Sequence, residues 1–150
     1  MTDETVVAYL DRIGVTAPAA CDAAGLRMLH RAHQLTVPFE NLSIHLAEPI
    51  SLDERDLADK IVRRRRGGFC YELNGQQTSP LSHFTRSTIC SRLTLGGRVS
   101  ISGRTLIQTQ GGTRTEQQLD TDDALLVAYR DHFGIELSRV PDDPAALRPA

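Results

Sequence analysis

The 150-residue chain has no tryptophan, a single lysine, Lys60, and only three cysteines, Cys21, Cys70 and Cys90. The cysteines are odd in number and far apart, without a CxxC pair, which argues against a disulfide framework and against a zinc site. No stretch approaches the roughly 18 apolar residues of a membrane-spanning helix. A net charge of −2 provides no general attraction to nucleic acid or to a membrane surface. We therefore expect a protein that binds neither of them.

The composition is that of a globular protein, with 40% hydrophobic and 24% charged residues. Residues 1–10 carry acidic side chains where a signal peptide needs a basic segment and then a long apolar run. These features predict a cytoplasmic location, where thiols stay reduced.

Helical periodicity dominates the first half of the chain. A first helix is expected over residues 3–13, and a second runs from a cap at Asp22 to Val37–Pro38, because a residue before proline avoids the helical region. Ser51-x-x-Glu54 has the form of a capping box and opens a third helix that ends in the basic run 63–66. The apolar face of this third helix consists of Leu57, Ala58, Ile61 and Val62.

Strand periodicity replaces it in the second half, after a polar break over residues 76–80. Candidate strands cover residues 87–94, 99–101, 105–109 and 113–119, separated by glycine-containing turns. A last helix follows a cap at Thr121 or Asp120 and ends at Gly134, and the tail from Val140 is expected to fray. Its inward side chains are Leu125, Leu126, Tyr129 and Phe133. The fold class is therefore α+β: an N-terminal helical bundle of about three to four helices, an antiparallel β meander and a C-terminal helix.

One stretch concentrates the chemistry, RGGFCYELN at residues 66–74. A thiol at a helix N-terminus behind arginines forms a thiolate readily, so Cys70 is a candidate nucleophile. Gly67 and Gly68 would let the backbone turn sharply and leave room beside the sulfur. Two other interpretations are a structural cysteine buried in a turn and a redox-sensing thiol, although the latter lacks a resolving cysteine.

These residues resemble the arylamine N-acetyltransferase family. Residues 33–42, HQLTVPFENL, resemble the family's H-x(4)-PFENL segment, and residues 66–74 resemble its RGGxCxE-N signature around the catalytic cysteine. The stretches 82–85, 90–94, 103–107 and 129–135 resemble the last third of the same family. Family members carry most of a β-barrel between these two parts, including a catalytic His and Asp. The resemblance therefore implies an internal deletion with its seam near Gly75 to Gln77.

The resemblance implies acetyl transfer from acetyl-CoA, a cosubstrate, to an arylamine, hydrazine or N-hydroxyarylamine through a thioester on Cys70. It implies no metal and no bound cofactor. Tyr71 would supply an oxyanion-binding N–H, Arg66, Gly67 and Gly68 would support the motif, and Phe39 and Phe84 would lie near the amine. Residues 1–75 would form the helical domain, and residues 76–150 a truncated β-barrel remnant with the C-terminal α/β lid segment.

The missing His and Asp leave an alternative open, a catalytically inactive family member or binding remnant. His45 or His83 could in principle approach Cys70, whereas His30, His33 and His132 suit structural or surface roles. Removal of barrel strands would also expose sheet edges, which predicts marginal stability or self-association through an open edge.

Overall fold

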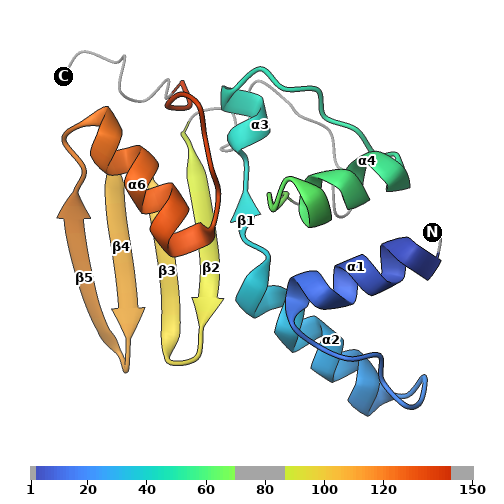
Figure 1. The fold of residues 1–150 in the computed structure, drawn as a ribbon. Coiled ribbons are helices and arrows are strands. Elements are labelled where there is room, and N and C mark those ends of the chain that lie inside the picture. The colour runs from blue at the N-terminus through green and yellow to red at the C-terminus, as the bar shows by residue number, and fades with distance from the viewer. Residues whose placement is uncertain (1–2, 70–86, 143–150) are drawn as a thin grey trace.

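The computed structural model describes residues 3–69 and 87–142. The helical elements are α1 (Asp3–Ile13), α2 (Ala23–Thr36), α3 (Leu42–His45), α4 (Glu54–Ala58), the π-helix η1 (Asp59–Arg63) and α6 (Asp122–Phe133). The strands are β1 (Phe39–Glu40), β2 (Ile89–Thr94), β3 (Gly97–Ser102), β4 (Thr105–Gln110) and β5 (Thr113–Gln118). The predicted α+β class, with helices first, then an antiparallel meander and then a helix, is confirmed (Figure 1).

The five strands form one antiparallel sheet in the order β1-β2-β3-β4-β5. Strands β2 to β5 follow one another through tight turns, as the glycine spacing predicted. Strand β1 was not predicted: Phe39 and Glu40 lie opposite Ser91 and Cys90 of β2, about fifty residues later in the chain. This two-residue strand carries the sheet into the helical half, so the two halves share one hydrogen-bonded layer (Figure 1).

Helix α6 lies across one face of the sheet (Figure 1). Thr121 caps its N-terminus by accepting a hydrogen bond from the N–H of Ala124, and Gly134 ends it in the left-handed conformation with φ +67°. The N–H of Gly134 donates to Arg130 O at 2.9 Å, as in an αL ending, and the N–H of Ile135 donates to Tyr129 O at 3.2 Å. The main core lies between helix and sheet. It consists of Leu42, Cys90, Val99, Ile101, Leu106, Leu119, Leu125, Ala128, Tyr129, Phe133 and Ile135.

Three predicted details near the helix ends are corrected by the structure. Asp53, not Ser51, is the N-cap of α4, because its carboxylate accepts from the N–H of Arg55. The third helix continues as the π-helix η1, whose wider turn changes which side chains share a face. As a result Lys60 is buried there, while Leu57 is only half-buried. Of the tail predicted to fray from Val140, residues 140–142 are described and held in place, because the N–H of Asp142 donates to His45 O at 3.0 Å, and the rest lies outside the described residues.

Arginine side chains join the elements by donating to carbonyl groups at helix ends. Arg92 of β2 donates to Leu35 O in the last turn of α2 and to His132 O in the last turn of α6. Arg12 of α1 donates to Ile61 O and to Arg65 O beside the end of η1. Each guanidinium thereby satisfies carbonyls that have no partner within their own helix. No helix in residues 3–69 and 87–142 combines the length and apolar character needed to cross a membrane.

Candidate functional site

The residues just before Cys70 are held by a buried ion cluster. We call this the Glu40 cluster and define it as Glu40, Ser43, Glu48, Lys60 and Arg66. The Glu40 side chain is 0% exposed, and those of Lys60 and Arg66 are 5% and 6% exposed. Buried charges are tolerated only when they are paired and hydrogen-bonded, so the cluster depends on each of its members.

Arg66 is the centre of the cluster and uses its guanidinium as a fork. Its Nε and Nη2 donate to the two carboxylate oxygens of Glu40 at 3.0 and 3.2 Å, and its Nη1 donates to Glu48 at 3.1 Å. Glu40 also accepts from the N–H of Leu42 at 2.7 Å, and Lys60 Nζ lies 3.9 Å from it. Burial alone would lower the pKa of Arg66, but the charges and hydrogen bonds of Glu40 and Glu48 outweigh it and raise that pKa.

This pairing changes how Arg66 acts on its surroundings. The sequence suggested that its positive charge would stabilise a Cys70 thiolate, yet two carboxylates balance that charge. The neighbouring Arg63 and Arg64 are exposed and pair with Asp59 at 3.4 Å. Arg66 therefore ties the segment before the cysteine to Glu40 and Glu48, and contributes less to a positive potential than expected.

Asn41 fixes the other side of the same segment to the sheet. Its Nδ2 donates to Ser87 O at 2.8 Å, and its Oδ1 accepts from the N–H of Ile89 at 2.7 Å. Asn41 Nδ2 also lies 3.4 Å from Nε2 of His45, which is buried at the end of α3. The PFENL residues thus connect sheet and ion cluster, and periodicity could not have identified them.

Gly67 is required for a reason other than the sharp turn predicted for Gly67 and Gly68. Neither has a positive φ; the left-handed residue here is Arg65, with φ +51°. A Cβ on Gly67 would lie 1.8 Å from Pro38 O, so only glycine allows this close approach. Beside it, Gly68 forms an isolated parallel β-bridge with Phe39, and the Gly68 carbonyl accepts a hydrogen bond from the N–H of Glu40 at 3.0 Å. The backbone at the two glycines therefore packs directly against the PFENL segment.

The structure places some predicted site residues and not others. Arg66, Gly67, Gly68 and Phe39 come together as just described. The remaining predicted residues, Cys70, Tyr71, Phe84 and His83, lie outside the described residues. Among the other histidines, His33 accepts or donates a 2.9 Å hydrogen bond with Tyr9 between α1 and α2, and partial burial, His30 and Arg12 lower its pKa.

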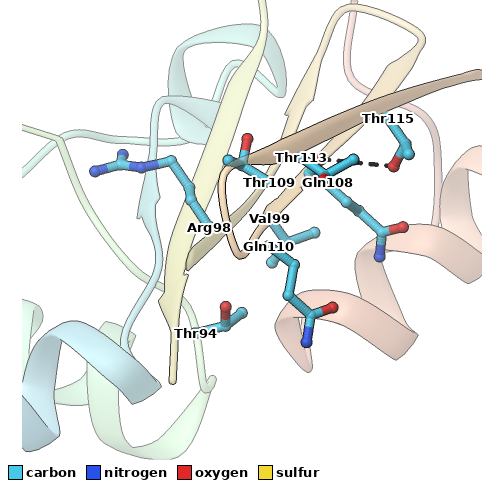
Figure 2. A pocket seen from close by; sticks show the side chains of 8 residues that line it. All are labelled: Thr94, Arg98, Val99, Gln108, Thr109, Gln110, Thr113 and Thr115. Carbon is cyan, nitrogen blue, oxygen red and sulfur yellow. Dashed lines mark hydrogen bonds between the residues drawn. The ribbon is translucent and has the colours of Figure 1, made fainter. Parts of the chain in front are cut away.

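The hollows in the described part of the chain include one beside the cluster and one on the sheet. One of about 290 Å³ adjoins the cluster and is lined by Leu46, Glu48, Arg64, Arg66, Glu136, Leu137, Ser138 and Arg139. The other, of about 400 Å³, lies on the sheet among mostly uncharged polar side chains at the β4–β5 hairpin (Figure 2). Because Val99, Gln108 and Thr115 are cross-strand neighbours, this second hollow is on the face that carries the core. It holds none of the predicted site residues.

Comparison with known proteins identifies the family. A family model described as N-acetyltransferase matches the chain in two pieces, residues 22–76 and 75–141. Arylamine N-acetyltransferase / N-hydroxyarylamine O-acetyltransferase of Salmonella typhimurium is 37% identical over 100 residues, 65% of this chain and 36% of that protein. Arylamine N-acetyltransferase 1 of Oryctolagus cuniculus is 34% identical over 128 residues, 75% of this chain and 44% of that protein. The chain belongs to the arylamine N-acetyltransferase family.

Solved structures of the family share the fold. An arylamine N-acetyltransferase from Bacillus cereus, described as having a Cys-His-Glu catalytic triad, superposes with a TM-score of 0.79 at 16% identity, covering 91% of this chain and 100% of that chain. That of Mycobacterium marinum in complex with CoA gives a TM-score of 0.76 at 20% identity, covering 86% and 92%.

The share of a relative's length that this chain covers differs between the sequence matches and the superpositions. The chain spans less than half the length of the two relatives it matches in sequence, yet its superpositions extend over nearly the whole of the solved chains. The two family matches meet at residues 75–76, which agrees with the deletion predicted near Gly75 to Gln77.

The cluster makes stability sensitive to acid through Glu48. Partial burial would raise the pKa of Glu48, but the charge of Arg66 and hydrogen bonds from Ser43 and Arg66 outweigh it and lower that pKa. The stabilisation is complete above the unfolded value of about 4.3 and is lost as the pH falls through the folded value. We expect Glu48→Gln to lose less thermal stability than the parent between about pH 5 and pH 3, measured by circular dichroism. The exposed Glu4→Gln should keep the parent's acid response, and equal responses of all three would contradict this role.

Proposed function

We propose that this chain accepts an acetyl group from acetyl-CoA on Cys70 and passes it, at a much reduced rate, to an arylamine, hydrazine or N-hydroxyarylamine. The Cys70 sulfur attacks the thioester carbonyl, the bond to the CoA sulfur breaks, and CoA leaves as its thiol. The acceptor nitrogen or oxygen then attacks the new thioester and releases the Cys70 thiol. Because the reaction needs a reduced thiol, we place the protein in the cytoplasm.

The observation that supports this proposal is that side-chain and backbone contacts hold the chain in place up to Phe69. The Arg66–Glu40 fork and the contact of Gly67 with Pro38 fix the backbone up to Phe69, which is 2% exposed and directly precedes Cys70. A nucleophile reacts faster when the backbone that carries it is held rigidly, because the entropy cost of positioning it is no longer part of the reaction barrier. The family match covers this motif and the PFENL segment that supports it.

We infer the reduced rate from what the sequence lacks and from the pairing of Arg66. The sequence contains no Asp-x-Gly-Phe strand of the kind that carries the family's Asp, and the nearest fully described arginine, Arg66, is neutralised by Glu40 and Glu48. With the Arg66 charge balanced and no Asp of the family's kind in the sequence, nothing among the described residues lowers the pKa of a thiol here from its ordinary value of about 8.5, at which only a small fraction is ionised at neutral pH. The same observation favours the second candidate, a family remnant that keeps the cysteine without turnover.

Intact-mass measurement after incubation with acetyl-CoA tests the proposal. We expect one added acetyl group that is absent from Cys70→Ala and present in Cys21→Ala, since Cys21 is exposed and free among the described cysteines and serves as the matched control. Cys90 is 0% exposed and burial raises its pKa well above its ordinary value, so it should not compete. Release of the acetyl group upon addition of an arylamine separates a slow enzyme from a remnant. Equal labelling of Cys70→Ala and the parent would overturn the proposal.

A further inference from the structure

Strand β5 ends the sheet on the side away from the helical half, and none of the described residues pairs with its outer edge. All six of its side chains are exposed. Helix α6 crosses the face of the sheet and leaves this edge uncovered (Figure 1). An exposed edge offers a row of unpaired N–H and C=O groups to another strand.

The turn that precedes β5 determines which of its backbone groups point outward. Gly111 and Gly112 both have positive φ, +56° and +83°, as in the two-residue turn that suits a hairpin. Such a turn makes Gln110 and Thr113 a hydrogen-bonded pair, and hydrogen-bonded pairs then alternate along the ladder. The N–H and C=O groups of residues 114, 116 and 118 therefore face the free edge.

The charges on this edge are self-complementary. Arg114 and Glu116 are 61% and 52% exposed and pair with each other within the strand, with Arg114 Nε 2.8 Å from Glu116 Oε1. If a second β5 lies antiparallel with the twofold axis at Thr115, Arg114 of each copy lies opposite Glu116 of the other. Both residues of each pair then have their backbone groups directed at one another.

Neighbouring registers do not have this property. Shifting the axis to residue 114 places two arginines opposite each other, and shifting it to residue 116 places two glutamates there. Placing the axis between residues would match an outward backbone group with an inward one, which forms no ladder. Opposite charges directly across a ladder stabilise it and like charges destabilise it.

We propose that two copies of this chain associate through β5, antiparallel and centred on Thr115, to form one continuous sheet. The occupant of the edge is thus a second copy of the same chain. This pairing gives an isologous contact with twofold symmetry, the commonest kind in soluble homodimers. It is independent of Cys70, so it stands whether or not acetyl transfer occurs.

Charge swaps measured by sedimentation velocity over a concentration series test the interface. Arg114→Glu and Glu116→Arg each replace two opposite-charge pairs by two like-charge pairs, and each should raise the dimer Kd by about tenfold or more. The double swap restores both pairs and should recover the parent's Kd. The matched control is the adjacent pair Arg130–Asp131 on α6, exposed by 58% and 56%. Arg130→Glu and Asp131→Arg change the net charge equally and should leave Kd unchanged.

Disulfide trapping tests the register directly. In a background of Cys21→Ala and Cys70→Ala, Thr115→Cys places both thiols on the axis at a non-hydrogen-bonded pair, within the Cα separation a disulfide accepts. It should give a covalent dimer under mild oxidation. Gln117→Cys, on the same face, leaves its two thiols about 13 Å apart along the strands and should not. A parent that sediments as a monomer throughout, swaps without effect, or equal trapping of both variants would overturn the proposal.

Discussion

Arg66→Met is expected to lower the free energy of unfolding by about 3–5 kcal/mol, because it leaves a fully buried carboxylate without its main partner. Among the described residues, Glu40 would keep the N–H of Leu42 and the more distant Lys60, at 3.9 Å. Glu48 would lose its charged partner in the same step. Urea unfolding followed by circular dichroism measures the loss.

Arg63→Met is the matched control, because Arg63 belongs to the same basic run but its side chain is 81% exposed and pairs only with Asp59. Its effect should stay within about 0.5 kcal/mol. Arg66→Lys, which restores the charge without the fork, should fall between the two and provides a measurable variant if Arg66→Met does not fold. A loss below about 1 kcal/mol for Arg66→Met would show that the cluster does not support the fold.

Gly67→Ala is expected to cost about 3 kcal/mol or more, the upper range for overpacking, although it adds a single methyl group. The new Cβ would lie 1.8 Å from Pro38 O and 2.8 Å from Pro38 C. These are backbone atoms, and the neighbouring hydrogen bond from Glu40 N to Gly68 O prevents an easy retreat. The same urea titration, read beside acetylation of Cys70, shows whether the close approach also positions the thiol.

Gly96→Ala controls for the general effect of replacing a glycine. Its added Cβ would meet only the flexible side chain of Gln110, at 3.4 Å, in ordinary contact. We expect a change within about 0.5 kcal/mol for that variant. Similar losses for both alanine variants would show that close packing against Pro38 is not what requires glycine at position 67.

Local signals predicted most of the architecture. The apolar period over residues 3–13, the Asp22 cap, the glycine turns and the Gly134 ending all appear where the sequence placed them. These features depend on residues within one or two turns of each other, which is the range that periodicity and capping patterns report. The family resemblance extended this to the cysteine motif.

The contacts that support the motif escaped prediction because they are not local. Strand β1 has only two residues, too few for any period, and its partner in β2 is about fifty residues away. Glutamate and lysine usually lie on a solvated surface, yet Glu40 and Lys60 are both buried. Glu40 pairs with Arg66, 26 positions later in the chain, and with Lys60, 20 positions later. The π-helix that turns Lys60 inward has no recognised sequence signal here.

The burial of Lys60 has a chemical consequence for the whole molecule. It is the only lysine in the sequence, and its side chain is 5% exposed within the ion cluster. The other basic side chains counted in the net charge are all arginines, whose guanidinium groups stay protonated and are poor nucleophiles. The folded protein thus offers no accessible side-chain amine that could capture an acetyl group from acetyl-CoA or from its own thioester. Acetylation of a lysine side chain should therefore not compete with acetylation of the thiols.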